Sequence, residues 1–251
     1  MESVFIGVIG LVIGSFLNVC IYRIPRGESI SYPPSHCGSC SHKLSPKDLI
    51  PVISYTFLQG RCRYCKAKIS VQYPLIEIFN AILYILIYMK YGYSILTIKY
   101  CIFTSLLIVI GTIDYKTQDV YTSSIVFGIV TGLLFIGIEA FVCENVLPLH
   151  DIMGAFIGAA IIGIIVFLTR GMGEGDIEIA GVCGLFLGTK LVLLDLFLAV
   201  IIGGIAGIVI LSLKLKDKKD SIAFGPCIAI GAVISMLLGN ELINAYLSLC
   251  F

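Results

Sequence analysis

The sequence Gly171-Met172-Gly173-Glu174-Gly175-Asp176-Ile177-Glu178 combines three glycines with three acids, and it lies between long apolar runs. The run before it, residues 152–169, is long enough to cross a bilayer, and so is a later run, residues 191–213. A carboxylate at full membrane depth costs roughly 2.5–3.5 kcal/mol unless it is hydrated, paired or protonated. Non-helical backbone at this depth is tolerated where it lines a cavity or packs in protein. The stretch therefore predicts either a flexible, carboxylate-bearing wall of a cavity near one membrane face or a solvated glycine-rich loop.

The composition is that of a polytopic membrane protein. Hydrophobic residues make up 58% and charged residues 13% of the 251 residues, whereas soluble domains carry about 25% charged residues. The formal net charge of +1 gives no indication of a nucleic-acid partner. No Lys or Arg precedes the first apolar run, so we expect an uncleaved membrane span rather than a signal peptide.

The apolar runs predict an all-α polytopic membrane protein with about eight transmembrane helices. The expected spans are approximately residues 4–22, 73–89, 95–113, 120–141, 152–169, 177–188, 191–213 and 222–246. The sixth is too short for a perpendicular span of about 20 residues, which predicts a short or a kinked helix. Positive charges follow the first span and none precedes it, so we expect the loop after it in the cytoplasm and both termini outside. The lysine cluster within residues 214–219 is also cytoplasmic if the sixth segment crosses.

The polar loop after the first span holds two Cys-x-x-Cys pairs, Cys37 with Cys40 and Cys62 with Cys65. Two such pairs at this spacing match a closed tetrahedral thiolate site, so we expect structural zinc. A disulfide is disfavoured in a reducing compartment. Four thiolates leave no open position for water, so this zinc is not expected to be hydrolytic. The chain is thus expected to comprise a first helix (residues 1–22), a zinc loop (23–72) and a membrane core (73–251).

Two acids, Asp114 and Asp176, are each expected where an apolar run meets the cytoplasmic face. Two neighbouring carboxylates cannot both ionise cheaply, so one keeps a proton, and the pair can perform general acid–base hydrolysis without a catalytic metal. The glycines of this catalytic loop, Gly173 and Gly175, would let an extended peptide approach closely. Asp119 lies about 140° around a helix from Asp114 and is expected to be solvated or paired.

Several motifs, in this order along the chain, resemble one family, the bacterial type IV prepilin peptidases, which are bifunctional leader peptidase/N-methyltransferases. Gly173-Glu174-Gly175-Asp176 resembles the Gly-x-Gly-Asp signature of this class of intramembrane aspartyl proteases, and Ile113-Asp114 resembles its first aspartate. The other similar segments are Gly14-Ser15-Phe16-Leu17-Asn18-Val19, Tyr22-Arg23-Ile24-Pro25, Pro51-Val52-Ile53-Ser54-Tyr55, Gly60-Arg61-Cys62-Arg63-Tyr64-Cys65, Tyr73-Pro74-Leu75-Ile76-Glu77 and Phe224-Gly225-Pro226.

The resemblance implies an enzyme of the bacterial cytoplasmic membrane that cuts the leader from type IV prepilins or pseudopilins at the cytoplasmic face, after a glycine. It then methylates the new N-terminal amine with S-adenosylmethionine. Asp114 and Asp176 would be the catalytic pair, and the four cysteines the zinc ligands. The chain departs from the family pattern at Tyr121, where proline is frequent, and at Glu178, where lysine is frequent. No glycine-rich fingerprint for S-adenosylmethionine is visible in the sequence.

Three other functions fit part of these observations. A proton-coupled transporter would use the same buried carboxylates as a proton relay. A membrane methyltransferase without peptidase activity would keep the loop and not need both aspartates. A zinc-loop scaffold protein would need neither aspartate.

Overall fold

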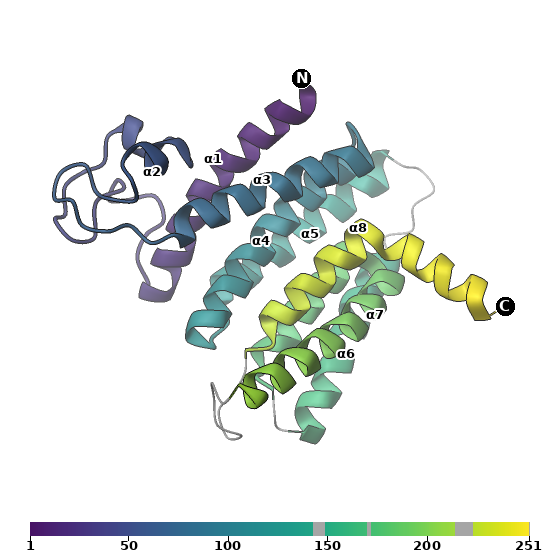
Figure 1. Cartoon of the computed structure of the whole chain (residues 1–251). Coiled ribbons are helices and arrows are strands. Elements are labelled where there is room, and N and C mark those ends of the chain that lie inside the picture. The colour runs from purple at the N-terminus through teal and green to yellow at the C-terminus, as the bar shows by residue number, and fades with distance from the viewer. Residues whose placement is uncertain (143–148, 170–171, 214–222, 251) are drawn as a thin grey trace. The chain divides into compact units, whose positions relative to one another are not determined.

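The computed structural model describes residues 1–142, 149–169, 172–213 and 223–250. The described residues form helices and no β-strand, which confirms the predicted all-α class (Figure 1). Within these described ranges, seven helices are long and apolar enough to cross a membrane, as a polytopic membrane protein requires. The α-helices are α1 (Glu2–Arg23), α2 (Ile53–Phe57), α3 (Gln72–Tyr91), α4 (Ile95–Thr117), α5 (Thr122–Val142), α6 (Leu149–Thr169), α7 (Gly175–Ser212) and α8 (Gly225–Cys250).

The helices and the polar loop form two compact units, Met1–Val109 and Ile110–Phe251. The boundary falls within α4. The sequence-based division into residues 1–22, 23–72 and 73–251 has other boundaries. It remains a prediction about which segment carries which activity. The candidate metal ligands all belong to the first unit, and both candidate catalytic acids belong to the second.

In the first unit, α1 and α3 pack closely because glycines of α1 meet the backbone of α3. A Cβ on Gly10 would lie 2.6 Å from Ala81 Cα, and a Cβ on Gly14 would lie 2.7 Å from Glu77 Cα. Small residues allow such close approach in membranes, where side-chain amides also bond across helices. The Asn18 amide donates to the Tyr73 carbonyl oxygen at 3.1 Å. Two motifs of the resemblance, around Asn18 and around Glu77, are thereby brought together.

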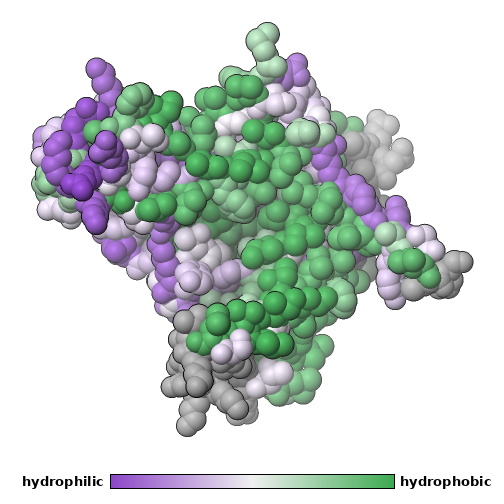
Figure 2. Space-filling model, viewed as in Figure 1, coloured by the Kyte–Doolittle hydropathy of each residue, from purple (hydrophilic) through white to green (hydrophobic). Residues whose placement is uncertain are grey.

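The segment between α1 and α3 is a polar loop with two isolated antiparallel bridges, His36 with Lys43 and Arg61 with Lys68. Hydrophilic residues gather over this loop, at the left of the view in Figure 2. Little of it is regular secondary structure.

In the second unit, α7 is two helices rather than one. Gly188 has φ 71° and ψ 177°, which no helix residue adopts. A Cβ on Gly158 of α6 would lie 2.5 Å from the Ala180 carbonyl oxygen and 3.1 Å from Val192 Cγ2. In a straight helix Ala180 and Val192 would be about 18 Å apart along the axis. Both can meet Gly158 only because the chain folds back at Gly188.

The two arms of this hairpin, before and after Gly188, correspond to the predicted sixth and seventh spans. The described residues thus hold eight apolar helical segments, in agreement with the prediction of about eight. The first arm is roughly 20 Å long at 1.5 Å per residue, which is shorter than the hydrocarbon core of about 30 Å. The predicted outer loop at 143–148, Arg170 with Gly171, and the lysine cluster at 214–219 lie outside the described residues.

Candidate active site and metal centre

Among the five acids around the predicted site, burial separates Asp114 and Asp176 from the rest. Asp114, in the last turn of α4, exposes 4% of its surface, and Asp176, in the first turn of α7, exposes 6%. Asp119, Glu174 and Glu178 are all exposed. A carboxylate placed at an apolar helix end and shielded from water is the arrangement that a proton-sharing pair needs.

One backbone N–H group holds each of these carboxylates. The Gly225 N–H, at the start of α8, donates to Asp114 Oδ2 at 2.9 Å. The Gly173 N–H, in the loop before α7, donates to Asp176 Oδ2 at 3.2 Å. Each carboxylate keeps its Oδ1 outside these two bonds, so each could face a water or a peptide with that oxygen.

The two carboxyl groups belong to one site within the second unit. The charge of Asp114 acts on Asp176, and the Cys227 thiol of α8 lies within the field of both. Position 225 also joins them, because a Cβ there would lie 2.5 Å from Asp114 Oδ2 and 3.0 Å from Cδ1 of Ile179, one turn after Asp176. Helices α4, α7 and α8 therefore supply the site together.

The two glycines of the candidate catalytic loop have different surroundings. A Cβ on Gly175 would lie 2.5 Å from Val120 Cγ2 and 2.7 Å from Val120 Cβ. A Cβ on Gly173 would come no closer than 4.0 Å to Asp176 Oδ2, and Gly173 is exposed. Gly175 is thus needed for packing, and the open side at Gly173 is where an extended peptide could approach.

The four cysteines of the loop lie together in two matching turns. Cys37 and Cys62 open the turns, and the N–H of each donates to a carbonyl oxygen five residues on, that of His42 at 3.0 Å and that of Ala67 at 2.8 Å. Ser41 and Lys66, each four residues after the first cysteine of its turn, both have positive φ, 56° and 61°. The two turns are therefore structural copies of one another, each presenting a Cys-x-x-Cys pair.

The sulfur positions fit a tetrahedral metal. All four Sγ atoms, of Cys37, Cys40, Cys62 and Cys65, lie within 4.8 Å of one another, and Cys37 Sγ is 3.8 Å from Cys65 Sγ. Zinc–sulfur bonds of about 2.3 Å in a tetrahedron require sulfurs roughly 3.8 Å apart. Four soft thiolates at this separation favour zinc over the hard cations that prefer oxygen ligands.

Backbone N–H groups also prepare the turns for thiolates. The N–H groups of Ser39 and Cys40 hydrogen-bond Cys37 and lower the pKa of its thiol to about 6. In the second turn the Ala67 N–H bonds the second cysteine, Cys65, but burial and the three neighbouring cysteines outweigh this bond and raise the pKa of the Cys65 thiol to about 11. Donors directed at sulfur stabilise the anion that a metal binds, so the residues present fit a structural metal centre.

Comparisons with known proteins agree with these features. The family model for the Bacterial Peptidase A24 N-terminal domain matches residues 8–91, and that for the Type IV leader peptidase family matches residues 101–208. A Prepilin leader peptidase/N-methyltransferase of Bacillus subtilis (strain 168) is 30% identical over 243 residues, covering 96% of each chain. The chain belongs to the type IV leader peptidase family.

Other members of this family bear the same name and cover most of the chain. The Prepilin leader peptidase/N-methyltransferase of Aeromonas salmonicida (strain A449) is 31% identical, covering 95% of this chain and 91% of the relative. That of Neisseria gonorrhoeae is 31% identical, covering 90% and 87%. No solved structure matches the chain. The resemblance inferred from the sequence motifs is thus confirmed.

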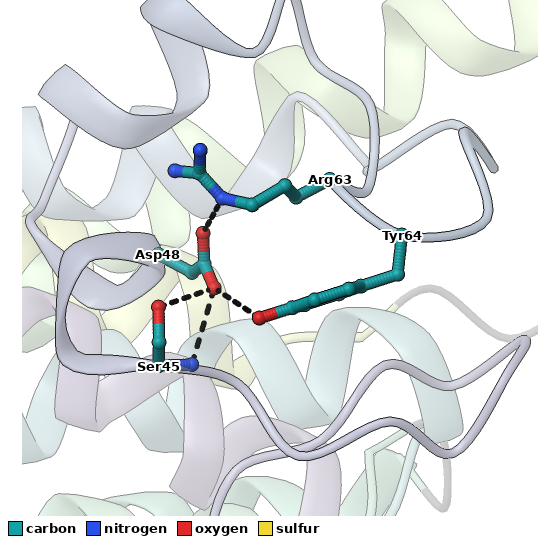
Figure 3. A network of polar contacts seen from close by, with 4 residues as sticks. All are labelled: Ser45, Asp48, Arg63 and Tyr64. Carbon is teal, nitrogen blue, oxygen red and sulfur yellow. Dashed lines mark hydrogen bonds and ion pairs between the residues drawn. The ribbon is translucent and has the colours of Figure 1, made fainter.

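The structure of this leader peptidase family member also shows a polar cluster in the loop that the sequence did not predict. Asp48, whose side chain is 3% exposed, accepts from Arg63 Nε at 2.6 Å, from Ser45 Oγ at 2.7 Å and from Tyr64 Oη at 3.4 Å (Figure 3). Burial alone would raise the Asp48 pKa, but the hydrogen bonds from Ser45 and Arg63 and the Arg63 charge outweigh it and lower the pKa to about 2. Asp48 therefore ties the second cysteine turn to the segment that follows the first.

The two residues that depart from the family pattern differ in their burial. Tyr121 is half-buried just before α5, and Glu178 is exposed one turn into α7. Neither carries a hydrogen bond to Asp114 or Asp176 among the bonds described for these two carboxylates.

Proposed function

We propose that this membrane protein is a prepilin leader peptidase that also N-methylates the residue freed by cleavage. The observation that carries the peptidase half is the pair of buried carboxylates, Asp114 and Asp176, each held by one backbone N–H. Membership of the type IV leader peptidase family and the printed names of the relatives support both halves.

In the proposed cleavage, the ionised carboxylate of the pair takes a proton from water, and the water oxygen forms a bond to the scissile carbonyl carbon. The protonated partner gives its proton to the carbonyl oxygen. Collapse of the tetrahedral intermediate breaks the C–N bond: the carboxyl group that took the water proton gives it to the leaving amine, and the other carboxylate takes a hydroxyl proton as the C=O bond re-forms. This is acid–base catalysis by two carboxyl groups whose proton affinities differ.

We assign zinc a structural role at Cys37, Cys40, Cys62 and Cys65. A closed four-thiolate site lacks the open coordination position that hydrolysis by zinc requires. Its contribution is to hold the two cysteine turns together in a loop with little apolar core.

The proposed substrates are type IV prepilins or pseudopilins, whose apolar helix lies in the membrane and whose leader stays in the cytoplasm. The proposed location is the bacterial cytoplasmic membrane, with the zinc loop and Asp114 and Asp176 on the cytoplasmic side and both termini outside. S-adenosylmethionine would supply the methyl group that replaces a proton of the new N-terminal amine.

The test is co-expression of the protein with a prepilin, followed by mass spectrometry of the prepilin N-terminus. The proposal predicts loss of the leader and a gain of one methyl group on the new terminus. A proton-coupled transporter or a scaffold protein would leave the prepilin intact, and a methyltransferase without peptidase activity would leave the leader in place.

A further inference from the structure

The first unit contains a cavity of about 560 Å³ that the peptidase chemistry does not use. It lies between the end of α1, the zinc loop and the start of α3, with Asn18, Arg23 and Glu77 among its lining residues. Its volume falls within the range of about 300–1,000 Å³ that is typical of sites for cofactors and drug-sized ligands. The inference below rests on the proposed function and deepens its methyltransferase half.

Two buried charges of opposite sign line this cavity, and neither is neutralised. Glu77 is 6% exposed; its carboxylate accepts from the Val52 N–H at 2.7 Å and has the Ser15 hydroxyl as a second polar neighbour. Arg23 is 5% exposed, and its guanidinium donates at 2.7 Å to two carbonyl oxygens, those of Ser29 and Pro33. Among the residues that the structure describes, no ion pair joins either group to an opposite charge.

A third lining group has spare hydrogen-bonding capacity. Asn18 is 2% exposed, and both of its described bonds use the amide nitrogen, which donates to Gly14 O and Tyr73 O. Its buried amide oxygen has no hydrogen-bond partner. An unpaired buried acceptor costs about 1–3 kcal/mol, which a ligand that donates a hydrogen bond would recover.

The remaining lining residues offer aromatic rings on which a flat ligand ring could stack, and some of them are exposed on the outer surface of α1. Phe16 and Tyr22 of α1 line the cavity and offer aromatic faces for stacking. Val12 and Phe16 are exposed on a helix that is apolar enough to cross a membrane. The cavity therefore borders the layer in which a prepilin helix would lie.

We propose that this cavity binds the methyl donor, S-adenosylmethionine. Arg23 would hold the carboxylate of its amino-acid end, Glu77 and Asn18 its cationic groups, and the aromatic side chains of α1 its adenine. A zwitterion that carries an additional positive sulfonium matches one buried cation and one buried anion, neither of which has a partner of opposite charge. Glu77 and Asn18 are binding residues in this account and take no part in leader cleavage.

The experiment measures equilibrium binding of radiolabelled S-adenosylmethionine to the purified full-length protein with its zinc content verified. Glu77→Gln removes the charge but keeps the size and an acceptor for the Val52 N–H. Glu28→Gln removes an exposed acid of the same loop that does not line the cavity and is the matched control. We expect donor binding to weaken about tenfold or more in Glu77→Gln and less than about twofold in Glu28→Gln. Leader cleavage by Glu28→Gln should stay within about twofold of wild type.

A second measurement does not depend on the variants. A photoreactive azido-adenosyl analogue of the donor, applied to wild-type protein, should label peptides from residues 12–23 and 35–77. Labelling confined to residues 110–250, or undiminished donor binding by Glu77→Gln, would overturn the cavity assignment. The proposed function would still stand in that case if the wild-type protein methylates the prepilin. A wild-type protein that cleaves prepilins but neither binds the donor nor methylates would overturn both the assignment and the methyltransferase half.

Discussion

The backbone N–H of Gly225 donates a hydrogen bond to Asp114 Oδ2 at 2.9 Å, across 111 positions of the chain. A side chain at position 225 would meet that same oxygen at 2.5 Å. The first candidate catalytic carboxylate is thus oriented by the start of α8, and only a residue without a Cβ lets the bond form at this distance. The motif Phe224-Gly225-Pro226 gains a physical role from this contact.

Gly225→Ala is therefore expected to lower leader cleavage at least tenfold, because the added methyl displaces the Asp114 carboxylate. Gly204→Ala is the matched control, since a Cβ on Gly204 meets nothing within 4 Å. Cleavage rates of a prepilin by equal amounts of the two folded variants check this. Equal activity of Gly225→Ala and Gly204→Ala would show that the Gly225 contact does not position Asp114.

Gly175→Ala is expected to reduce both stability and cleavage, because its methyl would overlap Val120. Val120→Ala removes the nearer overlapping atom, Cγ2, and keeps Cβ, so the double variant Gly175→Ala with Val120→Ala should recover part of both losses, a coupling that a double-mutant cycle measures. Gly173→Ala should leave thermal stability unchanged, because that side is open. Purely additive losses at positions 120 and 175 would remove this packing explanation.

Gly188→Ala tests the hairpin turn of α7. The φ and ψ of Gly188 lie in a region that is essentially restricted to glycine, where another residue costs of order 1–3 kcal/mol. A Cβ there would also overlap the His150 ring. We expect a lower midpoint of thermal unfolding than for Gly137→Ala, whose Cβ meets nothing within 4 Å. If the two variants melt together, α7 does not turn sharply at this residue.

Asp48→Asn is expected to speed the release of zinc to a chelator severalfold, because Arg63 and Ser45 lose their carboxylate partner. The native pKa of about 2 lies below the value of about 3.9 for an unfolded Asp. The carboxylate thus contributes fully above about pH 4, and this contribution is lost as the pH falls through about 2. The ratio of the zinc-release rate of Asp48→Asn to that of the wild type should then stay constant from pH 6 to pH 8. A ratio that changes over this range would mean that Asp48 titrates there.

The sequence was sufficient to predict the spans and the clustering of the four loop cysteines, because both follow from local patterns. Apolar runs set the helices, and two Cys-x-x-Cys pairs set the candidate ligands. The short sixth segment was recognised from its length alone. Its sharp return at Gly188 was not, because one glycine in an apolar run does not reveal whether a helix bends or reverses.

The contacts that complete the site could not be predicted in the same way. The Gly225 N–H is a backbone group, and its partner Asp114 lies in another helix, so no residue type signals the pair. Beyond the shared Cys-x-x-Cys pairs, the equivalence of the two cysteine turns rests on the backbone angles at Ser41 and Lys66, which the residue types there do not signal. The unpaired charges of Arg23 and Glu77 depend on how α1 packs against α3.

The central claim is that Asp114 and Asp176 perform the cleavage together, and single replacements by Asn test it most directly. Leader removal from a co-expressed prepilin is measured by mass spectrometry for Asp114→Asn, Asp176→Asn and the exposed neighbour Asp119→Asn, with zinc content as the folding control. We predict that each of the first two changes abolishes cleavage with zinc retained, and that Asp119→Asn cleaves like wild type. Retained cleavage in either Asp114→Asn or Asp176→Asn would contradict the paired mechanism.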